Sequence, residues 1–246
     1  MLFISPPFGN YISLDDTISV AGSFTLNPRY GLLGQIIKTL TYSYVHNGWI
    51  NKIGLRNNGI DWALKNVSEK SILSVAILNK SDIKPLLEKI PENRNIELNI
   101  SCPNTEKKMI SSGLSDFINN KRKWCIIKIS PTCSNTDIDN YYNIGFRQFH
   151  CCNTIPVKEG GLSGISLIPY TTNKVTYIKN KYNDTEIIAG GGITYYNDVL
   201  HYKAIGANHF SVSTLLFNPL LFTQFYYSYR EGTQGSPKPP PHLLNN

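Results

Sequence analysis

Short runs of apolar and β-branched residues, separated by turn residues, recur along the chain and indicate strands. They lie near residues 18–24, 71–77, 95–101, 124–130, 148–153, 186–191 and 209–214. Segments with helical spacing, several of them opening on an N-cap residue, lie between most of these runs. These segments include Ser81–Ile90, Ser111–Asn120, Asp137–Asn143 and Asn197–Ala204. Such alternation is typical of parallel strands, so the sequence predicts an α/β fold.

A closed barrel needs an eighth strand, which we assign to the N-terminal residues near Phe3 to Tyr11. The chain is then predicted to be a (β/α)8 TIM barrel, a fold that commonly takes about 250 residues. The few residues between Ser13 and Ile18 leave no room for a full helix, so the barrel is expected to be pared down near its N-terminus. We expect one domain over residues 1–230, closed by a helix over Asn218–Tyr229, and a disordered Pro-rich tail over 231–246.

Composition narrows the range of functions. No apolar stretch is long enough to cross a membrane, and the N-terminus lacks the basic and small-residue segments of a signal peptide, so a cytoplasmic protein is predicted. The cysteines are odd in number and form no CxxC, which argues against a disulfide framework. Neither the cysteines nor the histidines show metal-ligand spacing. We therefore predict no metal, and packed or solvated roles for the histidines.

The net charge of +7 raises the question of a nucleic-acid partner. The lysines are scattered, and the brief clusters at 106–108 and 121–123 lack the interleaved aromatic residues of a strand-binding surface. The abundance of Asn, Ile, Lys and Tyr resembles a codon bias that by itself inflates the charge. We therefore expect no nucleic-acid partner.

Polar side chains gather where several predicted strands end. In NIELNISCPNT, residues 95–105, Glu97 and Asn99 fall on one face of the strand and the isoleucines fall on the other. Cys102 follows at once, between the amides of Asn99 and Asn104. The cluster thus holds a thiol between two amides.

Other strands end in the same way. Lys128 lies near the end of WCIIKISP, where it shares a face with Trp124 and Ile126, and Asn153 and Thr154 end FHCCNT. A glycine turn at 190–192 and a hydroxyl-bearing turn at 213–214 follow the last two strands. In such barrels these two turns bind phosphate through backbone N–H groups, so a phosphorylated cofactor is predicted.

The chain resembles the dihydroorotate dehydrogenases, FMN-dependent barrel enzymes of pyrimidine synthesis. The segments that carry the resemblance occur in the family's order. They are NKIGLRNNG (51–59), NIELNISCPNT (95–105), WCIIKISP (124–131), CNT (152–154), GGLSG (160–164), IIAGGGI (187–193) and SVSTLL (211–216). Cysteine within NISCPN resembles the soluble class 1 enzymes, since the membrane-associated class 2 enzymes use serine there.

The resemblance implies oxidation of dihydroorotate to orotate, with Cys102 removing a proton and FMN accepting the hydride. It implies that the substrate is bound by Asn51, Gly54, Leu55, Asn99, Asn104, Asn153 and Thr154. It implies that FMN is bound by Ser23, Asn99, Lys128, Gly164, Gly191, Gly192, Ser213 and Thr214. Class 1 relatives are usually dimers, so a homodimer is one state open to this chain.

One departure from the family keeps other readings open. The family's second strand ends in a Lys-Ser pair, whereas SVAGSFTL places Gly22 before Ser23, and either Arg29 or Arg56 is a candidate for the replacement charge. A degenerate barrel that binds FMN or a nucleotide without turnover is therefore the main alternative. A tRNA dihydrouridine synthase-like flavoenzyme is a weaker one, because that family places its cysteine differently.

Overall fold

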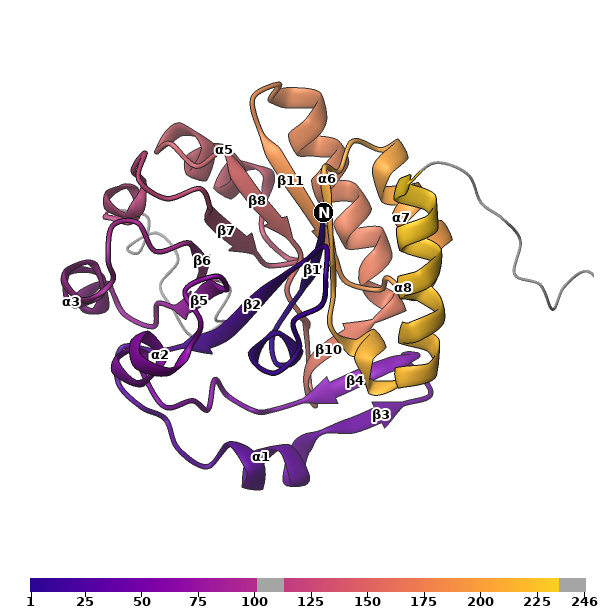
Figure 1. The fold of residues 1–246 in the computed structure, drawn as a ribbon, viewed down its shortest axis with the longest axis horizontal. Helices are drawn as coiled ribbons and strands as arrows, with labels where there is room; N and C mark the ends of the chain where they lie inside the picture. Colours follow the sequence, from indigo (N-terminus) through magenta and orange to yellow (C-terminus); the bar gives the residue numbers. More distant parts are fainter. Residues whose placement is uncertain (101–112, 235–246) are drawn as a thin grey trace, which may run out of the picture.

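The computed structural model describes residues 1–100 and 113–234. Eight parallel strands close into a barrel, as Figure 1 shows. The strands are β1 (Leu2–Ile4), β2 (Thr17–Phe24), β5 (Ile72–Ala76), β6 (Ile96–Asn99), β7 (Cys125–Ile129), β8 (Gln148–Cys151), β11 (Glu186–Gly190) and β12 (His209–Val212). Their hydrogen-bonded order is β1-β12-β11-β8-β7-β6-β5-β2, and β2 closes the ring on β1. The predicted (β/α)8 barrel is confirmed, with its first strand starting at Leu2.

Helices surround the barrel and connect its strands (Figure 1). They are α1 (Leu32–Thr39), α2 (Ile60–Asn66), α3 (Ile83–Lys89), α5 (Asn135–Asn143), α6 (Ile168–Lys181), α7 (Tyr196–Ala204) and α8 (Pro219–Gln234). Shorter 3-10 turns are η1 (Phe8–Asn10), η2 (Lys80–Asp82), η3 (Leu114–Phe117), η4 (Ile165–Leu167) and η5 (Thr214–Phe217). Ser134 caps α5 by accepting from the N–H of Asp137, whose carboxylate accepts from the N–H of Ser134 in return.

The helix expected over Ser111–Asn120 is wrong in its described part, where only the single turn η3 forms. Gly113 precedes the turn with a left-handed φ of 95°, and Ile118 follows it in an extended conformation, so the helix cannot continue in either direction. Residues 111 and 112 lie outside the described residues. At the other end of the chain, α8 runs past Arg230 to Gln234, so the first residues of the predicted tail are helical. Residues 235–246 of that prediction lie outside the described residues.

The connection between β1 and β2 is as short as the sequence indicates, since it holds only the turn η1. Gly9 in this turn is buried against the end of the barrel, where an added Cβ atom would clash with the carbonyl oxygens of Ile4 and Val20. The absence of a side chain thus lets η1 lie directly over the strand ends.

A second, four-stranded antiparallel sheet lies beside the barrel and is not predicted by the sequence. Its strands, in hydrogen-bonded order, are β3 (Thr41–Ser43), β4 (Gly48–Asn51), β10 (Gly160–Gly164) and β9 (Ile155–Val157). In Figure 1, β3 and β4 run with α1 along the lower edge of the molecule. The sheet joins a segment that follows β2 to one that follows β8.

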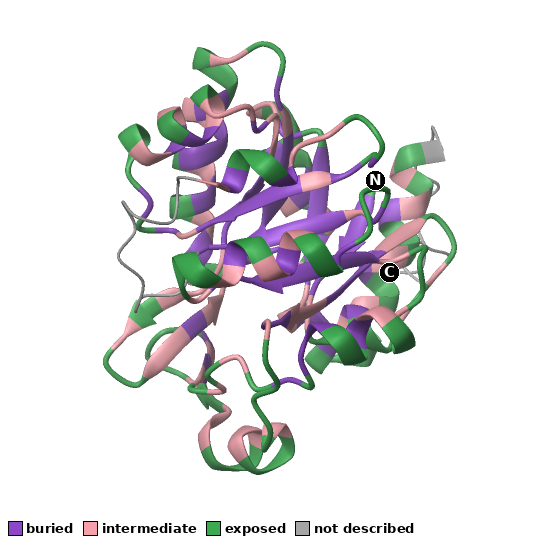
Figure 2. Ribbon diagram, turned by 90° about the vertical axis from the view of Figure 1, so that its left-hand side faces the viewer, coloured by how far each residue is buried: buried purple, intermediate pink, exposed green. Residues whose placement is uncertain are grey.

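Most of the barrel strands are buried on both faces, as expected of parallel strands covered by helices (Figure 2). Outward side chains such as Leu73 and Leu98 pack on the helices in the main core. Inward side chains form a smaller apolar plug of Phe3, Val20, Ile72, Trp124, Ile126 and Ile188. The shared face predicted for Trp124 and Ile126 is therefore the barrel interior. Within the described part of the chain, no helix combines the length and apolar character needed to cross a membrane.

The interior plug leads to a stability prediction. Phe3 is fully buried and meets Trp124 edge-on, with ring centroids 5.3 Å apart, so its removal leaves a cavity that the closed barrel cannot collapse. We expect Phe3→Ala to lower the free energy of unfolding by about 3–5 kcal/mol, measured by urea denaturation. Tyr227→Ala, at a site that is 61% exposed, serves as the control and should change it by about 0.5 kcal/mol or less. Equal losses in both variants would contradict this picture of the core.

Candidate active site

A row of polar side chains crosses the barrel interior above the apolar plug. Strand pairing places Asn99 of β6 beside Lys128 of β7, and Lys128 beside His150 of β8. Glu97 lies two residues before Asn99 on the same face of β6, and all four side chains are at least nine-tenths buried. The barrel interior therefore holds a carboxylate, an ammonium, an imidazole and an amide on three neighbouring strands.

Glu97 is the centre of this group. Its carboxylate accepts hydrogen bonds from the hydroxyl of Ser74 at 2.9 Å and from Nδ1 of His150 at 2.6 Å. The ammonium nitrogen of Lys128 lies 3.6 Å from the carboxylate. A fully buried carboxylate with three such neighbours is compensated both in charge and in hydrogen bonds.

The charges of the group follow from these contacts. Burial alone would raise the pKa of Glu97, but the ammonium of Lys128 and the contacts with His150 and Ser74 outweigh it and lower this pKa to about 2. Burial and the positive charge of Lys128 lower the pKa of His150, against the opposing effect of Glu97. We therefore assign an ionised Glu97 and a neutral His150 that donates its Nδ1–H.

Gly190 lies against the other side of the His150 ring, where a side chain would not fit. A Cβ atom added at Gly190 of β11 would lie 2.8 Å from Nε2 of His150 and 3.1 Å from the Cβ of Ser211. Both distances are shorter than carbon contacts normally allow. Gly190 thus provides the space that the imidazole occupies.

Hydrogen bonds lead from Glu97 to the amides predicted to bind substrate. The hydroxyl of Ser74 lies 2.8 Å from the hydroxyl of Ser23, and the amide nitrogen of Asn99 donates to Ser23 at 3.0 Å. The amide nitrogen of Asn153 donates to the side-chain oxygen of Asn99 at 3.1 Å, and Asn153 accepts from the N–H of Thr154 at 2.9 Å. The structure thus brings together Ser23, Asn99, Asn153 and Thr154, while Lys128 reaches the same network through Glu97.

Three further predicted substrate residues lie on the neighbouring antiparallel sheet or in the loop that follows its strand β4. Asn51 ends β4 and pairs with Gly161 of β10. A Cβ atom at Gly161 would lie 2.7 Å from the hydroxyl of Thr154, so Asn51 and Thr154 approach each other across this glycine. Gly54 and Leu55 follow β4 in a loop where both have left-handed backbones, with φ of 66° and 54°.

The predicted phosphate-binding residues also meet. An added Cβ atom at Gly192 would lie 3.2 Å from the carbonyl oxygen of Gly164, and both glycines have positive φ. Gly191 and Gly192 follow β11, and Ser213 and Thr214 follow its neighbour β12. The hydroxyl of Ser213 donates to the carbonyl of Pro6 at 2.8 Å, so the backbone N–H is the group of Ser213 suited to an anion.

Two predicted residues, the catalytic candidate Cys102 and the substrate-binding candidate Asn104, lie outside the described residues. Asn99 is the last residue of β6, so the chain enters that segment directly from the polar row. Of the other cysteines, Cys133, Cys151 and Cys152 are buried in the main core.

At Gly22, where the resemblance places the family's lysine, the backbone leaves no room for a side chain. Gly22 has a φ of 140°, and an added Cβ atom would clash with the carbonyl oxygen of Ser74. The side chain of Asn10 bonds both backbone polar groups of Gly22, at 2.8 and 3.3 Å. Arg29 donates to the carbonyl of Gly54 and Arg56 to the carbonyl of Tyr30. Both arginines remain exposed, and their hydrogen bonds hold the loops that precede α1 and follow β4. Lys128 is the cation that the described structure places in the polar row.

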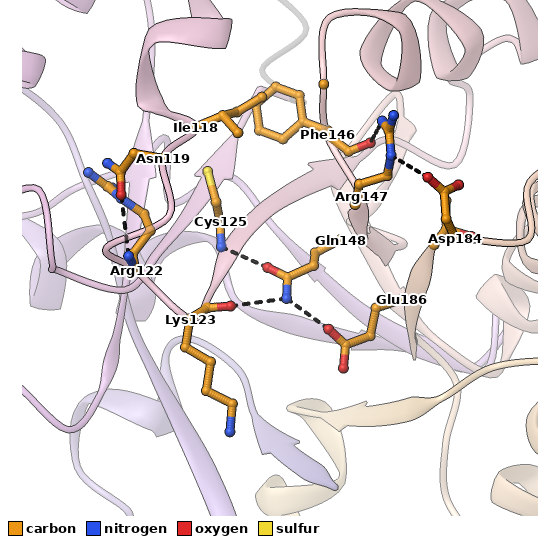
Figure 3. A pocket seen from close by; sticks show the side chains of 12 residues that line it. Ile118, Asn119, Arg122, Lys123, Cys125, Phe146, Arg147, Gln148, Asp184 and Glu186 are labelled. Carbon is orange, nitrogen blue, oxygen red and sulfur yellow. Dashed lines mark hydrogen bonds and ion pairs between the residues drawn. The ribbon is translucent and has the colours of Figure 1, made fainter.

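A cavity of about 340 Å³ lies at the opposite end of the barrel, where β7, β8 and β11 begin (Figure 3). There the side-chain amide of Gln148 accepts from the backbone N–H of Cys125 and donates to the backbone carbonyl of Lys123 and the carboxylate of Glu186. Burial raises the pKa of the Cys125 thiol to about 11, so this thiol stays protonated at neutral pH. Enzymes with this fold have their active sites at the other end of the barrel. The hydrogen bonds in this cavity connect the first residues of β7, β8 and β11.

Ser74 and His150 belong to the polar network, although the sequence does not identify them. Ser74 stands in an otherwise apolar strand, and His150 precedes the two cysteines of FHCCNT. The signal they share is a polar side chain at an inward position of a barrel strand. Their partnership with Glu97 depends on the barrel register, because 53 residues separate Glu97 from His150.

Comparisons with known proteins agree with this geometry. The family profile described as dihydroorotate dehydrogenase matches residues 10–224. The chain is 30% identical to the dihydroorotate dehydrogenase B (NAD(+)) catalytic subunit of Petrotoga mobilis, over 79% of this chain and 75% of the relative. It is 29% identical to the protein of the same name from Brachyspira hyodysenteriae, over 87% and 81% of the two chains.

Among solved structures, ligand-free dihydroorotate dehydrogenase from Eimeria tenella matches with a TM-score of 0.69 and 18% identity. The match covers 95% of this chain and 85% of that one, and it supports the shared barrel fold. Fold, motif order and family profile agree over most of the chain, which therefore belongs to the dihydroorotate dehydrogenase family.

Proposed function

We propose that this protein is an FMN-dependent oxidoreductase that converts dihydroorotate to orotate, as its family membership indicates. The observation that carries the proposal is the amide cluster at the strand ends, where Asn153 donates to Asn99 beside Ser23, with Lys128 in register next to Asn99. Amides and a cation suit a small ring that carries carbonyl groups and a carboxylate. This arrangement lies at the end of the barrel where such enzymes bind their ligands.

The residues present fit FMN. Gly164 and Gly192 lie close together and both have positive φ, and a glycine-rich backbone of this kind can direct its N–H groups at a phosphate. We infer that Gly164, Gly191, Gly192, Ser213 and Thr214 hold the phosphate through backbone N–H groups. Ser23, Asn99 and Lys128 are suited to the ring, where the lysine ammonium stabilises negative charge.

Dihydroorotate oxidation removes a proton from C5 and a hydride from C6. When bound, FMN supplies the hydride acceptor. We propose that Cys102 is the general base for the C5 proton and that Asn51, Gly54, Leu55, Asn99, Asn104, Asn153 and Thr154 hold the substrate. The assignment to a cytoplasmic enzyme and a homodimer is part of the same proposal and rests on the class 1 resemblance.

The alternative is a barrel that binds FMN without turnover, and Gly22 is the observation that favours it. The visible spectrum of the purified protein separates the two. We expect a yellow protein whose flavin absorbance bleaches when dihydroorotate is added without oxygen. Colour without bleaching would support the alternative, and a colourless protein that does not take up FMN would contradict both. Because the chain belongs to the dihydroorotate dehydrogenase family, a tRNA-modifying activity is not proposed.

Substitution of Cys102 tests the proposed base. We expect Cys102→Ala to lower the rate of flavin reduction by dihydroorotate by about 10²–10⁴-fold while FMN remains bound, because only the proton-transfer step loses its base. Cys125→Ala is the matched control, since Cys125 lies at the far end of the barrel and should leave the rate unchanged. Stopped-flow absorbance measures both variants. An unaltered rate in Cys102→Ala would remove this thiol from the mechanism.

The backbone at Gly22 leads to a prediction about the missing lysine. We expect Gly22→Lys to destabilise the protein and not to raise its activity, because the new Cβ atom would clash with the backbone of Ser74. Gly31→Lys is the matched control, because Gly31 also has positive φ, at 93°, but an added Cβ atom there meets nothing within 4 Å. Thermal unfolding should therefore show a larger loss for Gly22→Lys. Equal losses, or a gain of turnover at position 22, would contradict this account.

A further inference from the structure

The hydrogen-bond chain in the barrel interior has a direction, and Glu97 sets it. Glu97 is fully buried and ionised, so both of its oxygens can only accept hydrogen bonds. The hydroxyl of Ser74 therefore gives its single hydrogen to Glu97, at 2.9 Å. His150 donates to the second oxygen, and Lys128 supplies the compensating charge.

The next bonds in the chain follow from this first one. Because the hydrogen of Ser74 is committed to Glu97, Ser74 must accept from Ser23 across the 2.8 Å contact between their hydroxyls. Ser23 has then used its own hydrogen and must accept from its other neighbour. That neighbour is the amide nitrogen of Asn99, at 3.0 Å, so the NH2 group of Asn99 is turned toward Ser23.

The orientation of Asn99 in turn fixes Asn153. With its nitrogen toward Ser23, Asn99 presents its side-chain oxygen to the NH2 group of Asn153, at 3.1 Å. Asn153 then presents its own oxygen to the N–H of Thr154, at 2.9 Å. Both amides are thus held in one orientation.

We propose that Glu97 is a positioning residue, whose buried carboxylate orients the amides of Asn99 and Asn153 through Ser74 and Ser23 and holds the ammonium of Lys128 beside them. The proposal rests on the proposed function, because its purpose is to bind a ring with carbonyl and carboxylate oxygens. Removing the Ser74 hydroxyl breaks the chain but leaves the contact between Lys128 and Glu97. Glu97→Gln affects both, because its NH2 group can donate to Ser74 and its neutral amide no longer compensates Lys128.

The test compares Ser74→Ala and Glu97→Gln with Ser211→Ala in the FMN-loaded protein. Ser211 is the matched control, since its buried hydroxyl bonds Ser5 at 2.6 Å and, among the residues that the structure describes, makes no hydrogen bond to Glu97. Orotate affinity is measured from the change in flavin absorbance. We expect Ser74→Ala to weaken it about tenfold, Glu97→Gln to weaken it at least as much, and Ser211→Ala to leave it unchanged.

A second measurement does not depend on orotate. We expect the side-chain amide ¹⁵N–¹H signals of Asn99 and Asn153 to shift in Ser74→Ala and in Glu97→Gln, but not in Ser211→Ala. Shifted signals in a protein whose wild type fails to bind orotate would support the hydrogen-bond chain while refuting the proposed function. Wild-type orotate binding together with unshifted signals and unchanged affinity in folded Ser74→Ala would overturn the inference and leave the proposed function standing.

Discussion

The closed parallel barrel forces every second residue of its strands into one narrow interior, and the site depends on how that interior is filled. Its lower part is apolar, with Phe3, Trp124 and Ile126 packed together. Its upper part holds Glu97, which is ionised although it is fully buried. An uncompensated charge in such a place costs several kcal/mol, so Lys128, His150 and Ser74 are required where they are. Compensation of one buried charge thereby organises the polar groups around it.

Much of the fold follows from the sequence, because the barrel strands are continuous apolar runs that periodicity detects, such as the run over 124–130. The four-stranded sheet does not, because strands as short as Thr41–Ser43 carry too few residues to show a pattern. The helix expected around Ser115 is reduced to one turn by the left-handed Gly113, a local conformation that composition does not reveal. Strand positions are thus more predictable than the connections between them.

The candidate site divides in the same way. Asn99, Lys128 and Asn153 are found from the sequence because they stand at strand ends within recognisable motifs. His150 is expected there only to be packed or solvated, yet it bonds Glu97 at 2.6 Å. The pairing of β6, β7 and β8 brings these two side chains together, and strand register is a property of the closed barrel. Residue type therefore identifies the candidate ligand-binding groups, whereas the groups that contact them from below are found only in the three-dimensional structure.

The contact between His150 and Gly190 has a consequence for the history of the chain. The imidazole occupies the volume that a side chain at position 190 would need, so neither residue can change freely while the other is kept. A relative that carries alanine or a larger residue at the equivalent of position 190 must have a smaller or displaced group at the equivalent of position 150. The two positions are therefore expected to co-evolve, and a change at one of them in a relative signals that the buried carboxylate there is compensated by a different partner.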